Sequence, residues 1–215
     1  MAGGYAAVVL AGGTGQRWGG VDKVAVPVAG LPMLDRVLAA VADAAPRVVV
    51  GPPRPGLPTD VLRVRESPPG GGPVAAAASG LDMVPPGVAF VALLAGDLPY
   101  LTRDAVGLLR TAAEGRGPNG SIVDGAVLVD ETGRAQLLCG VWRAGALRAR
   151  LAELGPPDGS DGSVGPVGLV GQSMRRLVEG LRVAEVGVAL SGAAPPPWYD
   201  CDTEDDLRRA EEWGR

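Results

Sequence analysis

The sequence predicts an α/β fold in which a mostly parallel, doubly wound sheet lies between two layers of helices. Short apolar runs alternate with helical patterns through the first half of the chain, which is typical of βαβ units. The first apolar run, residues 5–10, has no polar alternation and therefore suits a strand buried on both faces. With 215 residues, 47% of them hydrophobic, the chain is expected to form one domain with a large core.

The first half predicts a regular order of elements. We expect strands at 5–10, 47–50, 61–64 and 88–94, a helix opened by Pro32 at its first position, and helices at 73–81 and 103–114. In the last of these helices, Leu108 and Leu109 are expected to face inward. Glycine-rich and proline-rich segments, including residues 11–20, separate the elements and are expected to form loops.

The second half is less regular. We expect strands at 121–129 and 136–142 around a turn, helices at 144–154 and 173–179, a strand at 181–186 and a last helix that Thr203 caps. Residues 155–171 are rich in glycine and predict a flexible loop.

Composition excludes several classes of chemistry. The chain has no histidine, which rules out serine or cysteine catalysis with a histidine base and zinc sites with histidine ligands. Its two cysteines, Cys139 and Cys201, argue against a disulfide-stapled secreted domain. The net charge of −4 and the lack of a basic run disfavour nucleic-acid binding. Without a membrane-length apolar run or a basic N-terminal region, we expect a cytoplasmic protein that binds no membrane.

The glycine-rich loop after the first strand predicts a phosphate site. Glycines let backbone N–H groups approach phosphate oxygens closely. Arg17 and Lys23 follow, but the spacing fits neither a Walker loop nor the dinucleotide fingerprint. Two cations on a loop at the carboxyl end of a strand suit a triphosphate. The alternative is that both are ordinary surface charges.

Carboxylates near the ends of two other segments predict a metal site. Asp97 follows the central strand, where ligands bind in parallel sheets, and carboxylates hold Mg²⁺ together with substrate phosphates. Asp202 precedes the last helix, and Asp200 shares its face if the segment is extended. The alternatives are a turn cap for Asp97 and a helix-dipole charge for Asp202.

Four segments of the sequence resemble the MobA-like nucleotidyltransferases, whose best characterised members are molybdenum cofactor guanylyltransferases. The first is the stretch LAGGTGQRWGGVDKVAVPVAGLPMLDRVL, which is similar to the family signature. The others are the segment at Gly72-Pro73-Val74, the segment LAGDLPYL around Asp97 and the segment CDTEDDL around Asp202. Two residues depart from the pattern: Trp18 replaces the usual Met, and Asp202 stands where guanylyltransferases often carry Asn and cytidylyltransferases often carry Asp.

The resemblance implies a Rossmann-like, three-layer α/β/α domain of the nucleotide-diphospho-sugar transferase type, with a nucleotide-binding half at 1–115 and an acceptor-binding half at 116–215. It implies Mg²⁺-dependent transfer of GMP from GTP to the phosphate of molybdopterin, with release of pyrophosphate, by a monomer or weak homo-oligomer. Arg17, Lys23 and Asp97 are implied as catalytic, and Asp97 and Asp202 as metal ligands. The implied nucleotide-binding residues are Leu10, Ala11, Gly12, Gly13, Thr14, Gly15, Arg17, Lys23, Glu66, Gly72 and Pro73.

Some assignments stay open at this level. Glu66 aligns loosely with a family acid that contacts the sugar or base, and it could equally be a surface acid. For the acceptor, Arg175 and Arg176 are the preferred pair among several arginines, which could otherwise be solvated. Transfer of CMP, another phosphorylated acceptor, or a non-catalytic nucleotide-binding regulatory module are the alternative functions.

Overall fold

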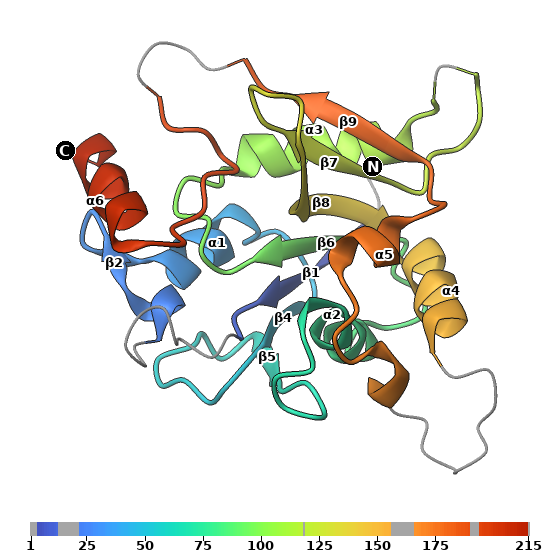
Figure 1. Ribbon diagram of the computed structural model, residues 1–215, viewed down its shortest axis with the longest axis horizontal. Helices are drawn as coiled ribbons and strands as arrows, with labels where there is room; N and C mark the ends of the chain where they lie inside the picture. The colour runs from blue at the N-terminus through green and yellow to red at the C-terminus, as the bar shows by residue number, and fades with distance from the viewer. Residues whose placement is uncertain (1–3, 13–21, 118, 156–165, 190–193, 215) are drawn as a thin grey trace.

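The computed structural model describes residues 4–12, 22–117, 119–155, 166–189 and 194–214, and its centre is a seven-stranded sheet (Figure 1). The strand order is β5-β4-β1-β6-β8-β7-β9. The pairs β5–β4, β4–β1, β1–β6 and β7–β9 are parallel, and β8 is antiparallel to both neighbours. The strands are β1 (Tyr5–Leu10), β4 (Arg47–Val50), β5 (Val61–Val64), β6 (Phe90–Ala95), β7 (Gly125–Val129), β8 (Ala135–Arg143) and β9 (Val183–Gly187), and β2 (Pro27–Val28) and β3 (Leu31–Pro32) form a separate hairpin.

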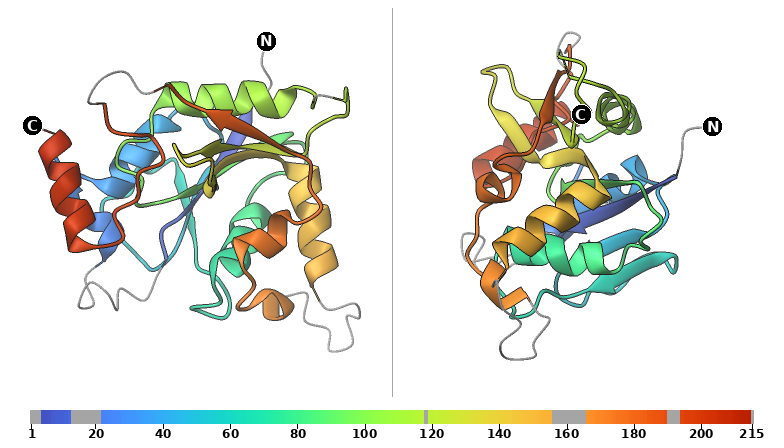
Figure 2. Two further views of the ribbon diagram at one scale, coloured as in Figure 1. Left: turned by 45° about the horizontal axis from the view of Figure 1, so that its top comes forward. Right: turned by 90° about the vertical axis from the view of Figure 1, so that its right-hand side faces the viewer.

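Helices cover both faces of this sheet, which confirms the predicted three-layer α/β fold (Figure 2). The helices are α1 (Met33–Ala40), α2 (Pro73–Asp82), α3 (Arg103–Glu114), α4 (Ala144–Leu154), α5 (Met174–Val178) and α6 (Glu204–Trp213), with 3₁₀ turns η2 (Lys23–Ala25) and η3 (Pro166–Leu169). Helices α1 and α3 pack on one face, and α2, α4 and α5 pack on the other. Every residue of β1 is buried because both of its faces are covered.

Local sequence signals fix where several helices begin. The side chains of Thr102 and Ser173 accept hydrogen bonds from backbone N–H groups in the first turns of α3 and α5. Thr203 and Asp206 form a reciprocal capping box at the start of α6. Pro73 opens α2 directly after Gly72, whose φ of 91° is a conformation that L side chains rarely adopt.

Three details of the sequence prediction are wrong. Leu108 is 49% exposed, because the buried stripe of α3 runs through Ala105, Val106 and Leu109. The strand expected from residue 121 begins at Gly125, and Ile122 makes only an isolated bridge with Arg116. Pro32 lies one residue outside α1 as its N-cap, since it also ends the short strand β3.

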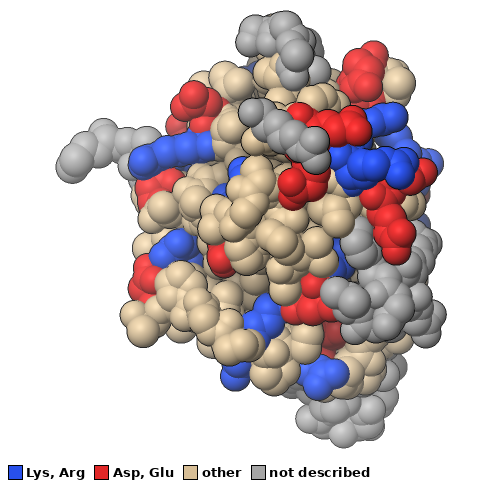
Figure 3. Space-filling view, turned by 90° about the vertical axis from the view of Figure 1, so that its left-hand side faces the viewer, with Lys and Arg blue, Asp and Glu red and all other residues tan. Residues whose placement is uncertain are grey.

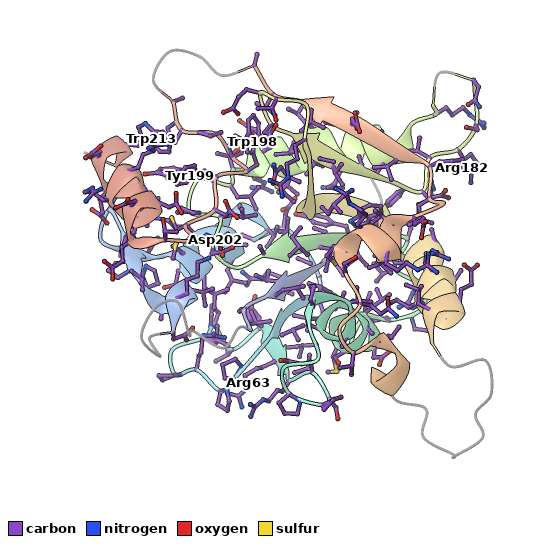
Figure 4. All side chains as sticks on the ribbon, viewed as in Figure 1. Arg63, Arg182, Trp198, Tyr199, Asp202 and Trp213 are labelled. Atoms are coloured by element: carbon purple, nitrogen blue, oxygen red, sulfur yellow. The ribbon has the colours of Figure 1, made fainter. Side chains whose placement is uncertain are left out.

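The fold brings distant segments to the carboxyl edge of the sheet, where β1, β4, β5 and β6 all end. The backbone N–H of Cys201 donates to the carbonyl of Asp97 at 3.4 Å, which ties the segment before α6 to the end of β6. The ring of Trp213 packs edge-on against Tyr100 and Tyr199, with centroids 5.9 and 4.8 Å away. Figure 4 shows Tyr199 and Trp213 on the same side of the molecule as Asp202. Among the described residues, no helix is long and apolar enough to cross a membrane.

Candidate active site

A lysine and two aspartates converge at the carboxyl edge of the sheet. The Nζ of Lys23 lies 2.5 Å from Oδ2 of Asp97 and 2.6 Å from Oδ1 of Asp202. Lys23 comes from η2, Asp97 from the residues after β6, and Asp202 from the segment before α6. Side chains that are 179 residues apart in sequence therefore meet at one ammonium group.

The environment of this cluster keeps the lysine charged. Burial lowers the pKa of Lys23, but the charges and hydrogen bonds of Asp97 and Asp202 outweigh that effect and raise it above its ordinary value. Reduced contact with water raises the pKa of Asp200, and the negative charges of Asp202 and Asp97 raise it further. Asp200 therefore belongs electrostatically to the same cluster, although its hydrogen bonds do not join it to Lys23.

The donor set suits a hard divalent cation. Because one ammonium contacts Asp97 and Asp202 together, their carboxylate oxygens already converge on a single positive charge. Within the described ranges, no group of three or more His, Cys, Asp or Glu side chains is placed to hold a metal. Two carboxylates with substrate phosphates and water are nevertheless the ligands that Mg²⁺ commonly takes. The residues present therefore fit Mg²⁺ bound jointly with a nucleotide, not a metal caged by protein alone.

A second group of residues, around Gly12 and Glu66, lies beside the end of β1. A Cβ added at Gly12 would lie 3.5 Å from Oε1 of Glu66, so the Glu66 carboxylate lies close to the backbone at Gly12. Oε1 of Glu66 accepts a hydrogen bond from the N–H of Gly70 at 3.1 Å. Oε2 is shielded from solvent and has no hydrogen-bond partner among the described residues. A buried carboxylate oxygen without a donor is costly, so a bound ligand that donates to it would stabilise this site.

The remaining predicted nucleotide residues fall into two sets. Leu10, Ala11 and Gly72-Pro73 line the same edge, where the N–H of Gly171 also donates to the carbonyl of Gly71 at 2.9 Å. Gly13, Thr14, Gly15 and Arg17 lie outside the described residues, as does most of the loop predicted at 155–171; of that loop, 166–169 form η3.

The preferred acceptor arginines do not join this cluster in the structure. Arg175 and Arg176 lie on α5, which packs against α4, α2 and β8. The guanidinium of Arg176 pairs with Glu179 one turn away. Cys139 and Cys201 are both buried. Burial raises the pKa of the Cys139 thiol to about 12, and burial together with the negative charge of Asp97 raises the pKa of the Cys201 thiol to about 12.

The sequence predictions did not include Arg54, a half-buried cation beside this cluster. Arg54, in the loop after β4, pairs with Asp22 immediately before Lys23. Its sequence context, a loop rich in glycine and proline, carries no periodic signal. The Asp22-Lys23 motif could have prompted a search for a partner to the aspartate, but no pattern could say which arginine it is.

Two of the cavities on the described part of the surface flank the sheet. One of about 530 Å³ lies between α3 and the end of α1, beside Tyr5, and contains the ion pairs of Asp43 with Arg103 and Arg110. The other, about 460 Å³, lies at the carboxyl ends of β7 and β9 and is lined by Val129, Val188 and Trp198. Only the second is on the edge where open α/β sheets bind their ligands. The candidate site lies at this same edge because Lys23, Asp97 and Asp202 meet there, although none of these three residues lines the cavity.

Comparison with known proteins identifies the family of this chain. Residues 7–167 match the model of the MobA-like NTP transferase domain. The chain belongs to the MobA-like NTP transferase family. It is 30% identical over 213 residues to the molybdenum cofactor guanylyltransferase of Rhodobacter capsulatus, covering 96% of this chain and 95% of that protein. Membership makes this chain a nucleotidyltransferase.

Solved structures of related fold extend over nearly the whole chain. The 2-C-methyl-D-erythritol 4-phosphate cytidylyltransferase of Thermus thermophilus superposes with a TM-score of 0.66 at 20% identity, covering 99% of both chains. The molybdopterin-guanine dinucleotide biosynthesis protein A of Archaeoglobus fulgidus gives 0.65 at 18% identity, covering 96% of this chain and 97% of that one. At these identities the likeness establishes the fold that this family member shares with them.

Proposed function

We propose that this nucleotidyltransferase moves GMP from GTP to the phosphate of molybdopterin, with Mg²⁺ and with release of pyrophosphate. The observation that carries the choice of GTP is the buried, unpartnered Oε2 of Glu66 beside Gly12. The Rhodobacter relative, a molybdenum cofactor guanylyltransferase over nearly the full length, supports the choice of acceptor.

An ionised carboxylate only accepts hydrogen bonds, which selects among nucleobases. Guanine presents two adjacent donors on its Watson–Crick edge, the ring N–H and the 2-amino group. Cytosine presents one amino donor beside a ring nitrogen that accepts, and that nitrogen would face the carboxylate unfavourably. Glu66 therefore favours guanine over cytosine at the end of β1.

The cluster at Lys23 accounts for the chemistry without histidine. An acceptor phosphate is already an anion at neutral pH, so the attack on the α-phosphorus needs no general base. The site instead has to neutralise charge and align the reacting groups. Lys23, held protonated, would stabilise negative charge at the α-phosphate. Asp97 and Asp202 would hold Mg²⁺, which supplies further neutralisation of the phosphates when bound. Arg17 would hold the β- and γ-phosphates.

A nucleotide panel tests the proposal. The melting temperature is measured with GTP, CTP, ATP and UTP, each with Mg²⁺, and pyrophosphate release is measured with molybdopterin as acceptor. A ligand that binds only the folded state raises stability by about 2.7 kcal/mol at a hundred times its Kd. GTP should give the largest shift. A larger shift with CTP would contradict the guanine assignment, and no shift with any nucleotide would favour the non-catalytic alternative.

Glu66→Gln tests the base contact itself. The amide offers a donor where guanine also donates, so kcat/KM for GTP should fall about 10- to 100-fold, equivalent to about 1–3 kcal/mol. The matched control is Glu114→Gln, an exposed glutamate at the end of α3, which should leave the nucleotide preference unchanged. An unchanged GTP preference in Glu66→Gln would remove Glu66 from the base site.

A further inference from the structure

Arg54 joins two segments that flank the catalytic lysine. Its Nη2 donates to the carbonyl oxygen of Ala11 at 2.5 Å, directly after β1. Its Nε lies 2.5 Å from Oδ2 of Asp22, and Nη2 lies 2.7 Å from Oδ1 of the same carboxylate. One guanidinium thus contacts the backbone where the glycine-rich loop begins and the side chain where that loop ends.

Burial and geometry make this contact rigid. The side chain of Arg54 is only 8% exposed, whereas that of Asp22 is 39% exposed. A planar guanidinium that meets a carboxylate with two donors fixes both distance and orientation, which a lysine ammonium does not do. Asp22 is also the N-cap of η2, yet its carboxylate does not bond to that turn and is left to Arg54.

The absence of a side chain at Gly51 leaves space for the contact between Arg54 and Ala11. A Cβ at Gly51 would lie 2.7 Å from the carbonyl oxygen of Ala11 and 3.0 Å from Nη1 of Arg54. Real Cβ atoms essentially never come as close as 2.7 Å, so the end of β4 tolerates only glycine beside this contact.

Lys23 is therefore held from both sides. On one side, Asp22 is fixed by Arg54. On the other, Val24 is buried, and its Cγ1 would be 3.1 Å from a Cβ at Gly96, the residue before Asp97. The ammonium of Lys23 has little freedom to stand anywhere but between Asp97 and Asp202.

We infer that Arg54 is a positioning residue for nucleotidyl transfer: through Asp22 and the carbonyl of Ala11 it sets the place of the Lys23 ammonium relative to the phosphates. The inference rests on the nucleotidyltransferase activity and not on the identity of the nucleotide. Misplacement of a reacting group by about 1 Å costs on the order of 100-fold in rate. We call the contacts of Arg54 with Asp22 and with the carbonyl of Ala11 the clamp. Loss of the clamp is expected to lower mainly kcat.

The chain supplies a matched control at the opposite edge of the same strands. Arg47, the first residue of β4, pairs with Asp60 and donates through Nη1 to the carbonyl oxygen of Leu38 at 3.3 Å. Its side chain is 11% exposed. This arginine makes the same two kinds of contact as Arg54, but it lies far along β4 from Lys23.

The test compares Arg54→Met, Arg54→Lys and Asp22→Asn with Arg47→Met. For each variant we would measure the melting temperature, the Kd of the nucleotide without Mg²⁺, and kcat. The two Arg54 variants and Asp22→Asn should lower kcat about 10- to 100-fold with Kd changed less than about threefold. Arg47→Met should lower the melting temperature comparably to Arg54→Met and leave kcat of the folded enzyme unchanged.

Two results would overturn the inference. A rise in Kd with unchanged kcat would mean that Arg54 binds the nucleotide directly. Equal, small effects of Arg54→Met and Arg47→Met on kcat would mean that both pairs only stabilise the fold. The double variant Arg54→Met/Asp22→Asn should lose no more activity than the worse single variant, and additive losses would also contradict the clamp.

Different results would contradict the clamp and the proposed function. Kinetics use whichever triphosphate the wild-type enzyme accepts, so a preference for CTP would refute the guanine assignment and leave this test intact. Amide hydrogen exchange in peptides covering Ala11–Gly12 and Asp22–Val24 gives a readout that needs no activity. Faster exchange in Arg54→Met than in Arg47→Met supports the clamp, and equal exchange contradicts it.

Discussion

The two edges of the central sheet use charge in different ways. At the amino edge, the hydroxyl of Tyr5 donates to Asp43 at 2.8 Å, Arg103 and Arg110 pair with Asp43 at 3.3 and 3.5 Å, and the Arg110 guanidinium lies 4.3 Å above the Tyr5 ring. At the carboxyl edge, one lysine serves two aspartates, and a buried oxygen of Glu66 has no donor among the described residues.

This difference supports the proposal that the carboxyl edge binds the substrates while the amino edge stabilises the fold. Charged side chains that already pair with one another inside the protein are not stabilised further by a ligand. A site with a buried carboxylate oxygen that lacks a donor, and with a lysine between two carboxylates, would be stabilised by a ligand that supplies the missing partner. Figure 3 looks onto the side of the molecule that carries α6 and shows acidic and basic side chains interspersed among uncharged residues. The candidate site is therefore distinguished by particular side-chain contacts and not by a surface patch of a single charge sign.

The largest effect is expected on catalytic activity, for a substitution at the carboxyl edge of the sheet. Asp97→Asn removes a carboxylate that contacts Lys23 and would hold the metal, so kcat/KM should fall about 10³-fold, as for loss of a preorganised electrostatic group. The control is Asp60→Asn at the amino edge, for which turnover per folded molecule should be unchanged. Steady-state pyrophosphate release measures both. Full activity in Asp97→Asn would remove this residue from the metal site.

Asp202→Asn should have a smaller effect at the same edge. Its carboxylate is 54% exposed, against 17% for Asp97, so more water can replace what the substitution removes. An asparagine also keeps an oxygen that can ligate a metal. We expect a loss of about tenfold in kcat/KM, smaller than for Asp97→Asn. A loss equal to that of Asp97→Asn, measured at saturating Mg²⁺, would show that the two carboxylates are equivalent.

Tyr5→Phe should change stability and its pH dependence at the amino edge. Burial alone would raise the pKa of Asp43, but the hydrogen bond from Tyr5 and the charge of Arg103 lower it below its ordinary value. A lowered pKa stabilises the fold above the unfolded-state pKa of about 3.9, and this contribution is lost as pH falls through the folded-state pKa.

At neutral pH, Tyr5→Phe should therefore lower the unfolding free energy by about 1 kcal/mol, since Asp43 is partly exposed. The difference from wild type should shrink below about pH 4. Urea unfolding at several pH values measures this, with kcat as the control, which should not change. A difference that stays constant into the acid range would mean that the Asp43 contact contributes nothing.

The smallest effect is expected at a surface ion pair outside the candidate site. Arg182 donates from Nε and Nη2 to Asp124 at 3.0 Å for both bonds, beside the start of β9 (Figure 4). Because Arg182 is exposed, salt screens this pair. Arg182→Ala should lower the melting temperature by less than half as much as Tyr5→Phe, and 1 M NaCl should abolish the difference. A larger effect that persists in salt would identify a packing role for the arginine stem.

Much of the fold could be read from local sequence because the signals are local. The uninterrupted apolar run of β1, Pro73 at the start of α2, and the capping residues Thr102 and Thr203 each determine a short piece of backbone with neighbours in sequence. Prediction failed where two tendencies competed. Leu108 has the right side chain for a core but lies one position off the buried stripe of α3.

The sequence by itself determined the family, the residue types of the site and the absence of histidine chemistry. Only the tertiary structure decided which of these residues meet. The contacts of Lys23 with Asp97 and Asp202 span 74 and 179 positions, and that of Arg54 with Asp22 spans 32. No local pattern encodes such distances. They arise because parallel strands deliver their carboxyl ends to one edge, and because packing of Gly51, Val24 and Cys201 fixes how closely the following loops approach.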